Sequence, residues 1–291
     1  MSTNSIATGA APTIKQDSAR ADSVVRAPEV RGEDRPGLGR PSDRYEALKQ
    51  YSLGKILAVW AAAAIPMGIL AWIVAPWLSD RIGGRDPFIE SLLICFIVGL
   101  LWQLVMVLFL VRREQGSLEW PRVRDALWLR APQDPKTGRV GKKVWLWVVP
   151  FVVLSAAANA LPIDPVGPLP RDLPHAIVTH RVEHFFSGNW FGFALLAAVA
   201  VLAPVVEELV FRGLLLPRMR AVFGRRDFVA SGVMHTLYHV HQPWSMPATL
   251  IDSTFAQAYP TKRFRSTWMG IITHTAPSIL IIGIVLSLVL K

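Results

Sequence analysis

Residues 204–213, Pro-Val-Val-Glu-Glu-Leu-Val-Phe-Arg-Gly, put three charged side chains into an apolar run that is long enough to cross a membrane. The charged residues are Glu207, Glu208 and Arg212. One such charge at the centre of a membrane-spanning helix costs roughly 2.5 to 3.5 kcal/mol on insertion scales. We therefore expect these three groups to be paired, or to lie in a cavity that holds water.

The order of the charges indicates which of them pair. Glu208 and Arg212 stand four residues apart with the acid first, which is the better order for an ion pair on one face of a helix. Glu207 is rotated by about 100° from that face. The spacing predicts a Glu208–Arg212 ion pair and leaves Glu207 to face another part of the protein.

The chain as a whole has the composition of a membrane protein. Of its 291 residues, 52% are hydrophobic, and the mean hydropathy is +0.36. These values predict an all-α, polytopic helical membrane protein with about seven transmembrane helices. The apolar runs lie at residues 56–78, 88–111, 144–161, 190–216, 228–242, 245–259 and 267–290. The fifth and sixth runs are short, and we expect them to be buried against protein rather than lipid.

Composition also divides the chain into four parts. Residues 1–48 lack hydrophobic periodicity and predict a disordered basic N-terminal tail. Residues 49–161 hold the first transmembrane helices with a basic loop, and residues 162–189 form a loop on the outer side. Residues 190–291 hold the remaining transmembrane helices and all the candidate site residues.

Basic residues gather in three segments, 112–143, 218–226 and 262–265. Loops that stay in the cytoplasm carry an excess of Lys and Arg. The pattern predicts a multi-pass protein of the cell (inner) membrane with a cytoplasmic N-terminus. The net charge of +10 arises from these loops, and no aromatic-rich basic face accompanies it, so we expect the lipid bilayer and not nucleic acid as a partner.

Histidines on two later helices fall at nearly the depth of Glu207. His235 and His239 share one face of the fifth predicted helix, and His274 lies on the seventh. At 1.5 Å per residue, Glu207, His239 and His274 lie roughly 16, 18 and 12 Å from the basic ends of their helices. A carboxylate can take a proton from water, and imidazoles can polarise a carbonyl, bind an oxyanion or hold a metal. This layer is what an intramembrane hydrolytic site requires.

In this order the motifs resemble those of the CPBP intramembrane proteases, also called CAAX prenyl protease or Abi-type proteins. The resemblance covers about residues 190–290, and its first motif is similar to the form of the prokaryotic branch. It indicates that residues 190–291 are a CPBP-like catalytic core. It rests on Glu207-Glu208-Leu-Val-Phe-Arg212-Gly213, Leu237-Tyr-His239 and Arg265-Ser-Thr-Trp-Met-Gly-Ile-Ile-Thr-His274.

The resemblance implies a role for each matched residue. The first glutamate of the family's pair is assigned as the base that activates water, which gives this role to Glu207. Glu208 and Arg212 would form the supporting pair, and His239 and His274 would complete the site and help to stabilise the oxyanion. The implied activity is the hydrolysis of a peptide bond in a peptide or membrane-protein substrate.

Two positions depart from the family pattern. The second motif usually reads Phe-x-x-x-His, and here His235 takes the Phe position. The third usually reads His-x-x-x-Asn or Asp, and here Ser278 takes the last position. His235 adds a further ligand or proton acceptor, whereas Ser278 keeps a hydroxyl donor of shorter reach.

The residues leave two alternatives open. Arg212 near the carboxylates, and Ser278 in place of a better ligand, favour a glutamic-type protease without a cofactor. A metallo-type site would hold zinc on Glu207, His239 and His274, with His235 as an additional ligand. The alternative function is a non-enzymatic membrane protein, either a proton-coupled transporter or a partner-binding module. For the endopeptidase we expect the site to open toward the cytoplasm.

Overall fold

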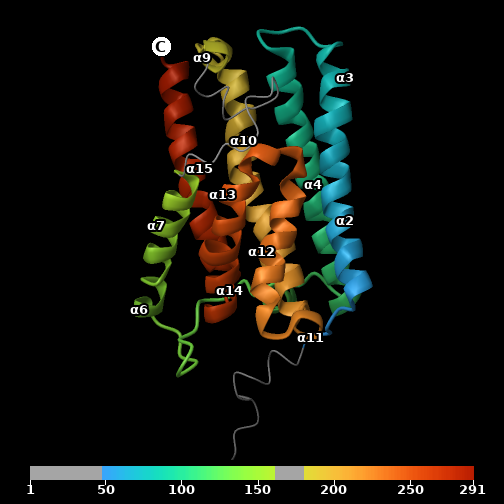
Figure 1. Cartoon of the computed structure of the whole chain (residues 1–291), viewed down its shortest axis with the longest axis vertical. Helices are drawn as coiled ribbons and strands as arrows, with labels where there is room; N and C mark the ends of the chain where they lie inside the picture. Colours follow the sequence, from blue (N-terminus) through green and yellow to red (C-terminus); the bar gives the residue numbers. More distant parts are fainter. Residues whose placement is uncertain (1–47, 161–179) are drawn as a thin grey trace, which may run out of the picture. The chain divides into compact units, whose positions relative to one another are not determined.

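The computed structural model describes residues 48–160 and 180–291 (Figure 1). Within these two ranges the chain is helical, and its only extended pairing is an isolated bridge between Gln133 and Val140. The predicted all-α class is confirmed. The expected tail at 1–48 and most of the expected outer loop at 162–189 lie outside the described residues.

Four of the described helices are long and apolar enough to cross a membrane, which confirms the polytopic membrane class. Two of them are single α-helices, and two continue through π-helical or 3₁₀ turns. The predicted count of about seven spans stays a prediction. The four are α2–η1–α3 (Leu53–Ile69, Leu70–Val74, Ala75–Ser79), α4 (Pro87–Gln115), α10–η2–η3 (Trp190–Glu208, Leu209–Leu215, Leu216–Arg218) and α15 (Thr267–Val289).

Shorter helices pack against these four. The fifth predicted run ends as an α-helix at Tyr238, and a 3₁₀ turn, η5 (His239–His241), follows it. The sixth run is a continuous helical segment from Met246 to Phe264 and extends past its predicted end. The shorter helices are α5 (Trp120–Ala126), α6 (Lys142–Trp145), α7 (Val148–Asn159), α9 (His180–Phe186), α11 (Arg220–Phe223), α12 (Asp227–Tyr238), α13 (Met246–Ile251), η7 (Asp252–Ala258) and α14 (Tyr259–Phe264).

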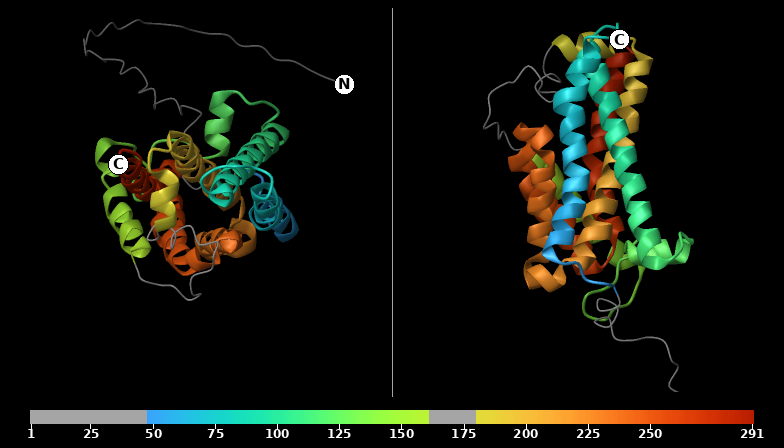
Figure 2. Two further views of the ribbon diagram at one scale, coloured as in Figure 1. Left: turned by 90° about the horizontal axis from the view of Figure 1, so that it is seen from above. Right: turned by 90° about the vertical axis from the view of Figure 1, so that its right-hand side faces the viewer.

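Helix α10 lies between α4 and α15, as Figure 2 shows from above, and packs extensively against both. Its continuation η2 is π-helical, and so is η7, which packs against α12. π-Helical turns inside α-helices occur frequently at functional sites. In this chain η2 carries Arg212, and η7 carries two of the residues that contact it, Ser253 and Gln257.

The basic segments gather at one end of these helices, the lower end in Figure 1, where α4 ends and α15 begins. We call it the basic end, and we call the end with α3 and α9 the opposite end. At the basic end Arg218 is fully buried and donates to Glu114 (Nε–Oε2 2.9 Å) and to the carbonyl oxygens of Ala126 and Leu214. Lys262 of α14 pairs there with Asp227.

Gly232 permits the close approach of α12 and η7. A Cβ atom at this position would lie 2.7 Å from Cα of Thr254. Gly232→Ala should separate the two helices and lower the free energy of unfolding by about 1 to 3 kcal/mol, measured as a lower Tm of the purified protein in detergent. In Gly283→Ala, the matched control on α15, the new Cβ meets no atom within 4 Å. Equal Tm values for the two variants would contradict this packing.

Candidate active site

Glu208 and Arg212 form the ion pair that their spacing predicts. Oε1 of Glu208 lies 3.2 Å from Nη1 of Arg212, and both side chains are fully buried. A buried charge is tolerated only when its partners satisfy it. The pair therefore requires further polar partners around Glu208 and Arg212, and these partners hold the end of α10 in place.

Arg212 has three further partners on neighbouring elements. Its Nη2 donates to the carbonyl oxygen of Ser253 at 2.9 Å and to Oε1 of Gln257 at 2.6 Å, both in η7. Its Nη1 lies 2.9 Å from Nδ1 of His235 on α12. Because a guanidinium group only donates, each of these atoms is an acceptor. One side chain thus joins η2, η7 and α12.

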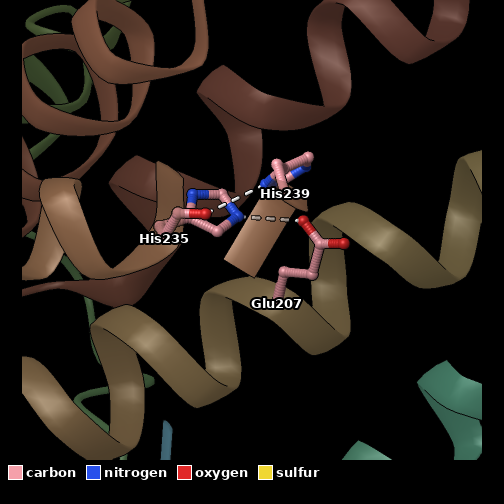
Figure 3. Close-up of side chains that lie close together, drawn as sticks. All are labelled: Glu207, His235 and His239. Atoms are coloured by element: carbon pink, nitrogen blue, oxygen red, sulfur yellow. Dashed lines mark hydrogen bonds and ion pairs between the residues drawn. The ribbon is translucent and has the colours of Figure 1, made fainter. Parts of the chain in front are cut away.

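Arg212 also sets the tautomer of His235. Since Nδ1 of His235 accepts from Arg212, the hydrogen of the neutral ring is on Nε2. That Nε2 lies 3.0 Å from Oε2 of Glu207 and donates to it (Figure 3). In this tautomer His235 is a hydrogen-bond donor to the candidate base, and its expected role as an extra ligand or proton acceptor stays a prediction.

Two residues that the sequence did not predict complete the surroundings of Glu207. The hydroxyl of Tyr238 donates to Oε1 of Glu207 at 3.3 Å, and Nε2 of Gln103 donates to the Tyr238 oxygen at 2.9 Å. Gln103 is a lone amide in the apolar centre of α4. Such an isolated polar residue in an apolar helix could have been recognised from the sequence as a candidate for the site. Tyr238 directly precedes His239 and carried no separate signal.

His239 and His274 each use Nδ1 to fix the ring. Nδ1 of His239 donates to the carbonyl oxygen of His235 at 3.0 Å (Figure 3). Nδ1 of His274 donates to Oε1 of Glu208 at 3.3 Å, and its Nε2 lies 4.0 Å from Oε2 of Glu207. In the neutral rings both Nε2 atoms keep a lone pair, and a protonated His274 would donate through Nε2 instead.

A cavity of about 220 Å³ adjoins these groups. Its apolar wall comes from α2, α4, α10 and α15, and its polar wall gathers the candidate residues. Ser278 lies one turn beyond His274 on α15 and is part of this wall. The polar wall is formed by Glu207, Tyr238, His239, His241, Gln242, His274 and Ser278.

The structure thus brings the predicted site residues together in two groups. One group lines the cavity, and the other is buried behind it and holds the first in place. The lining group is Glu207, His239, His274 and Ser278, and the buried pair is Glu208 and Arg212.

The cavity extends along α10 on the side of Glu207 that faces away from the basic end. Its lining residues on α10, from Leu196 to Ala203, precede Glu207. Toward the basic end, by contrast, Phe211 and Leu214 are fully buried. The side chains of η2 thus fill that side of the bundle, and the expected opening toward the cytoplasm stays a prediction.

The donor atoms could hold a metal. Glu207, His235 and His239 offer ligand atoms within 4.8 Å of one another. His235, however, would have to release Arg212 before its Nε2 could present a lone pair. In His239 and His274, by contrast, a carbonyl or carboxylate oxygen holds the Nδ1–H and Nε2 stays available, as in many zinc sites.

The fold and the site define a membrane protein with a cluster of carboxylates and histidines at an internal cavity. Residues 189–288 match the family described as Type II CAAX prenyl endopeptidase Rce1-like. Searches of curated proteins and of solved structures found no match. Residues 189–288 are therefore similar to the CAAX protease (CPBP) family, the same family that the sequence motifs resemble.

The buried Glu208–Arg212 pair should contribute to the free energy of unfolding. Arg212→Gln leaves Glu208 buried without its cation and should lower the free energy of unfolding by about 3 to 5 kcal/mol. The double variant Glu208→Gln/Arg212→Gln removes the stranded charge as well and should regain part of that loss. The measurement is denaturant unfolding of the purified proteins.

The exposed pair between Arg122 and Glu119 supplies the control. Its shortest N–O distance is 3.5 Å, and the side chains are 51% and 68% exposed. Arg122→Gln should change the unfolding free energy by less than about 1 kcal/mol. A double variant no more stable than Arg212→Gln alone would contradict the account of the buried pair.

Proposed function

We propose that the protein is a glutamic-type intramembrane endopeptidase that hydrolyses a peptide bond in a peptide or membrane-protein substrate. The observation that carries the proposal is the Glu207 carboxylate, which is 5% exposed, lines the cavity and has each of its oxygens held by a hydrogen bond. A general base needs such a fixed position next to the water that it deprotonates.

In this mechanism Glu207 takes a proton from a water molecule in the cavity. His235 and Tyr238 hold the carboxylate in one orientation through its two oxygens. His239 lines the cavity, and its Nε2, which keeps a lone pair in the neutral ring, would accept the second hydrogen of the same water. The water is then oriented for attack on a carbonyl carbon that lies in the cavity.

The developing oxyanion needs hydrogen-bond donors on the other side of the carbonyl. Protonated His274 would donate through Nδ1 to Glu208 and through Nε2 into the cavity, and its charge with that of Arg212 would balance the two carboxylates. Ser278 would add a hydroxyl donor, directly or through a bridging water. Such donors act on charge that develops in the transition state, and losing one typically reduces turnover by about 100- to 1,000-fold.

We further propose that the protein lies in the cell (inner) membrane with its N-terminus and basic end in the cytoplasm. The support is the concentration of Lys and Arg in the loops of that end.

Glu207→Gln tests the central role. An amide of the same shape cannot accept the proton, so turnover should fall by at least about 100-fold while the protein stays folded. The readout is cleavage of a peptide library by purified protein in lipid vesicles, followed by mass spectrometry. Glu119→Gln changes a carboxylate that is 68% exposed, far from the cavity, and should retain wild-type turnover.

A folded Glu207→Gln variant that cleaves at the wild-type rate would remove Glu207 from this role. A wild-type protein that cleaves no peptide of the library would favour the non-enzymatic alternative.

Zinc on Glu207, His239 and His274 would act as a Lewis acid and lower the pKa of a bound water. We propose the metal-free form, because Arg212 already places a fixed positive charge beside both carboxylates. Activity should therefore survive dialysis against a chelator, and elemental analysis should find less than stoichiometric zinc in active protein. One zinc per chain, with activity lost on chelation and restored by zinc, would establish the metallo-type instead.

A further inference from the structure

We propose that the active-site cavity receives its substrate from the membrane face opposite the basic end. The substrate would then be a protein segment that lies in, or emerges from, the non-cytoplasmic half of the bilayer. This inference rests on the proposed function of the same cavity and adds the location of the substrate to it.

The first observation is the distribution of charge between the two ends. Lys and Arg fill the segments 112–143, 218–226 and 262–265 at the basic end. The described part of the opposite end carries few, namely Arg81 and Arg85 between α3 and α4, Arg181 in α9, and Lys291. The excess of basic residues assigns the basic end to the cytoplasm.

The second observation is that the bundle is closed between Glu207 and the basic end. Phe211, Leu214 and Arg218 follow Glu207 along the chain, and all three are 0% exposed. Arg218 also bonds Glu114 of α4, so α4 and η3 are joined across this end. A peptide segment approaching from the cytoplasm would have to displace a packed apolar layer and a buried ion pair.

The third observation is the direction in which the cavity extends. Its walls include Leu196 and Ala203, which precede Glu207 on α10, and Ser278 and Ile281, which follow His274 on α15. Helix α10 runs toward the basic end and α15 runs away from it (Figure 1). Both pairs of residues therefore lie between the catalytic cluster and the opposite end.

A polar turn also borders the cavity. α12 and α13 turn back well before the opposite end (Figure 1). The turn between them carries His241 and Gln242, and both residues line the cavity. The cavity is thus bordered by apolar helix faces and by a polar turn inside the membrane. Such a border suits a segment with apolar side chains whose backbone must find polar partners.

Cysteine accessibility tests the direction of access without requiring a known substrate. Cys95, the single native cysteine, is buried and is first replaced by Ala. Gln242→Cys reports on the cavity, while the exposed positions Arg81→Cys and Arg139→Cys report on the opposite and basic ends. Each variant is exposed to a charged, membrane-impermeant thiol reagent in sealed right-side-out and inside-out vesicles.

We expect Gln242→Cys to react from the same side as Arg81→Cys, in right-side-out vesicles, and Arg139→Cys to react only in inside-out vesicles. Reaction of Gln242→Cys from the side of Arg139→Cys would overturn the proposal. Reaction from neither side, or labelling of Arg139→Cys from outside, would overturn it too. If Gln242→Cys does not fold, Ala203→Cys, one turn before Glu207 on the cavity wall, takes its place.

The labelling does not depend on catalysis, so the two proposals can fail separately. If the proposed function is wrong, the wild-type protein will cleave no peptide, whichever side Gln242→Cys is labelled from. If the direction of access is wrong but the function is right, Gln242→Cys would be labelled from the cytoplasmic side while the wild-type protein cleaves peptides.

Discussion

The guanidinium group of Arg212 is the part of the structure on which the arrangement of the site depends. It is fully buried and contacts Glu208, His235, Ser253 and Gln257 on three helical elements. A buried cation is stable only if these partners remain in place. Its presence therefore fixes η2, η7 and α12 relative to one another, at the depth where Glu207 and the histidines lie.

As a result, Glu207 has buried, hydrogen-bonded groups on one side and a cavity on the other. Behind Glu207, the chain of hydrogen bonds from Glu208 through Arg212 and His235 ends on the carboxylate and orients it. In front of Glu207 lies the cavity of about 220 Å³, which in the proposed function would hold the water and the substrate. Catalytic groups held in this way do not need to reorganise during the reaction, and such preorganisation is the main source of electrostatic stabilisation in enzymes.

The sequence predicted the features that local geometry determines. The Glu208–Arg212 pair follows from the spacing of residues along one helix, and the common depth of Glu207 and the histidines follows from the rise per residue. The rotation of each helix about its axis depends on packing between helices and could not be predicted. The contact of His235 with Glu207, the hydrogen bond from Tyr238 and the direction in which the cavity opens all depend on that rotation.

Arg212 orients Glu207 through His235, and the tautomer of His235 is the measurable consequence of this arrangement. Ring ¹⁵N spectra of the purified protein, with His235 assigned from the His235→Phe variant, report which nitrogen carries the hydrogen. The account predicts a neutral ring with its hydrogen on Nε2, and an Nε2 resonance that shifts in Glu207→Gln. A ring with its hydrogen on Nδ1, or an Nε2 resonance unaffected by Glu207→Gln, would contradict it.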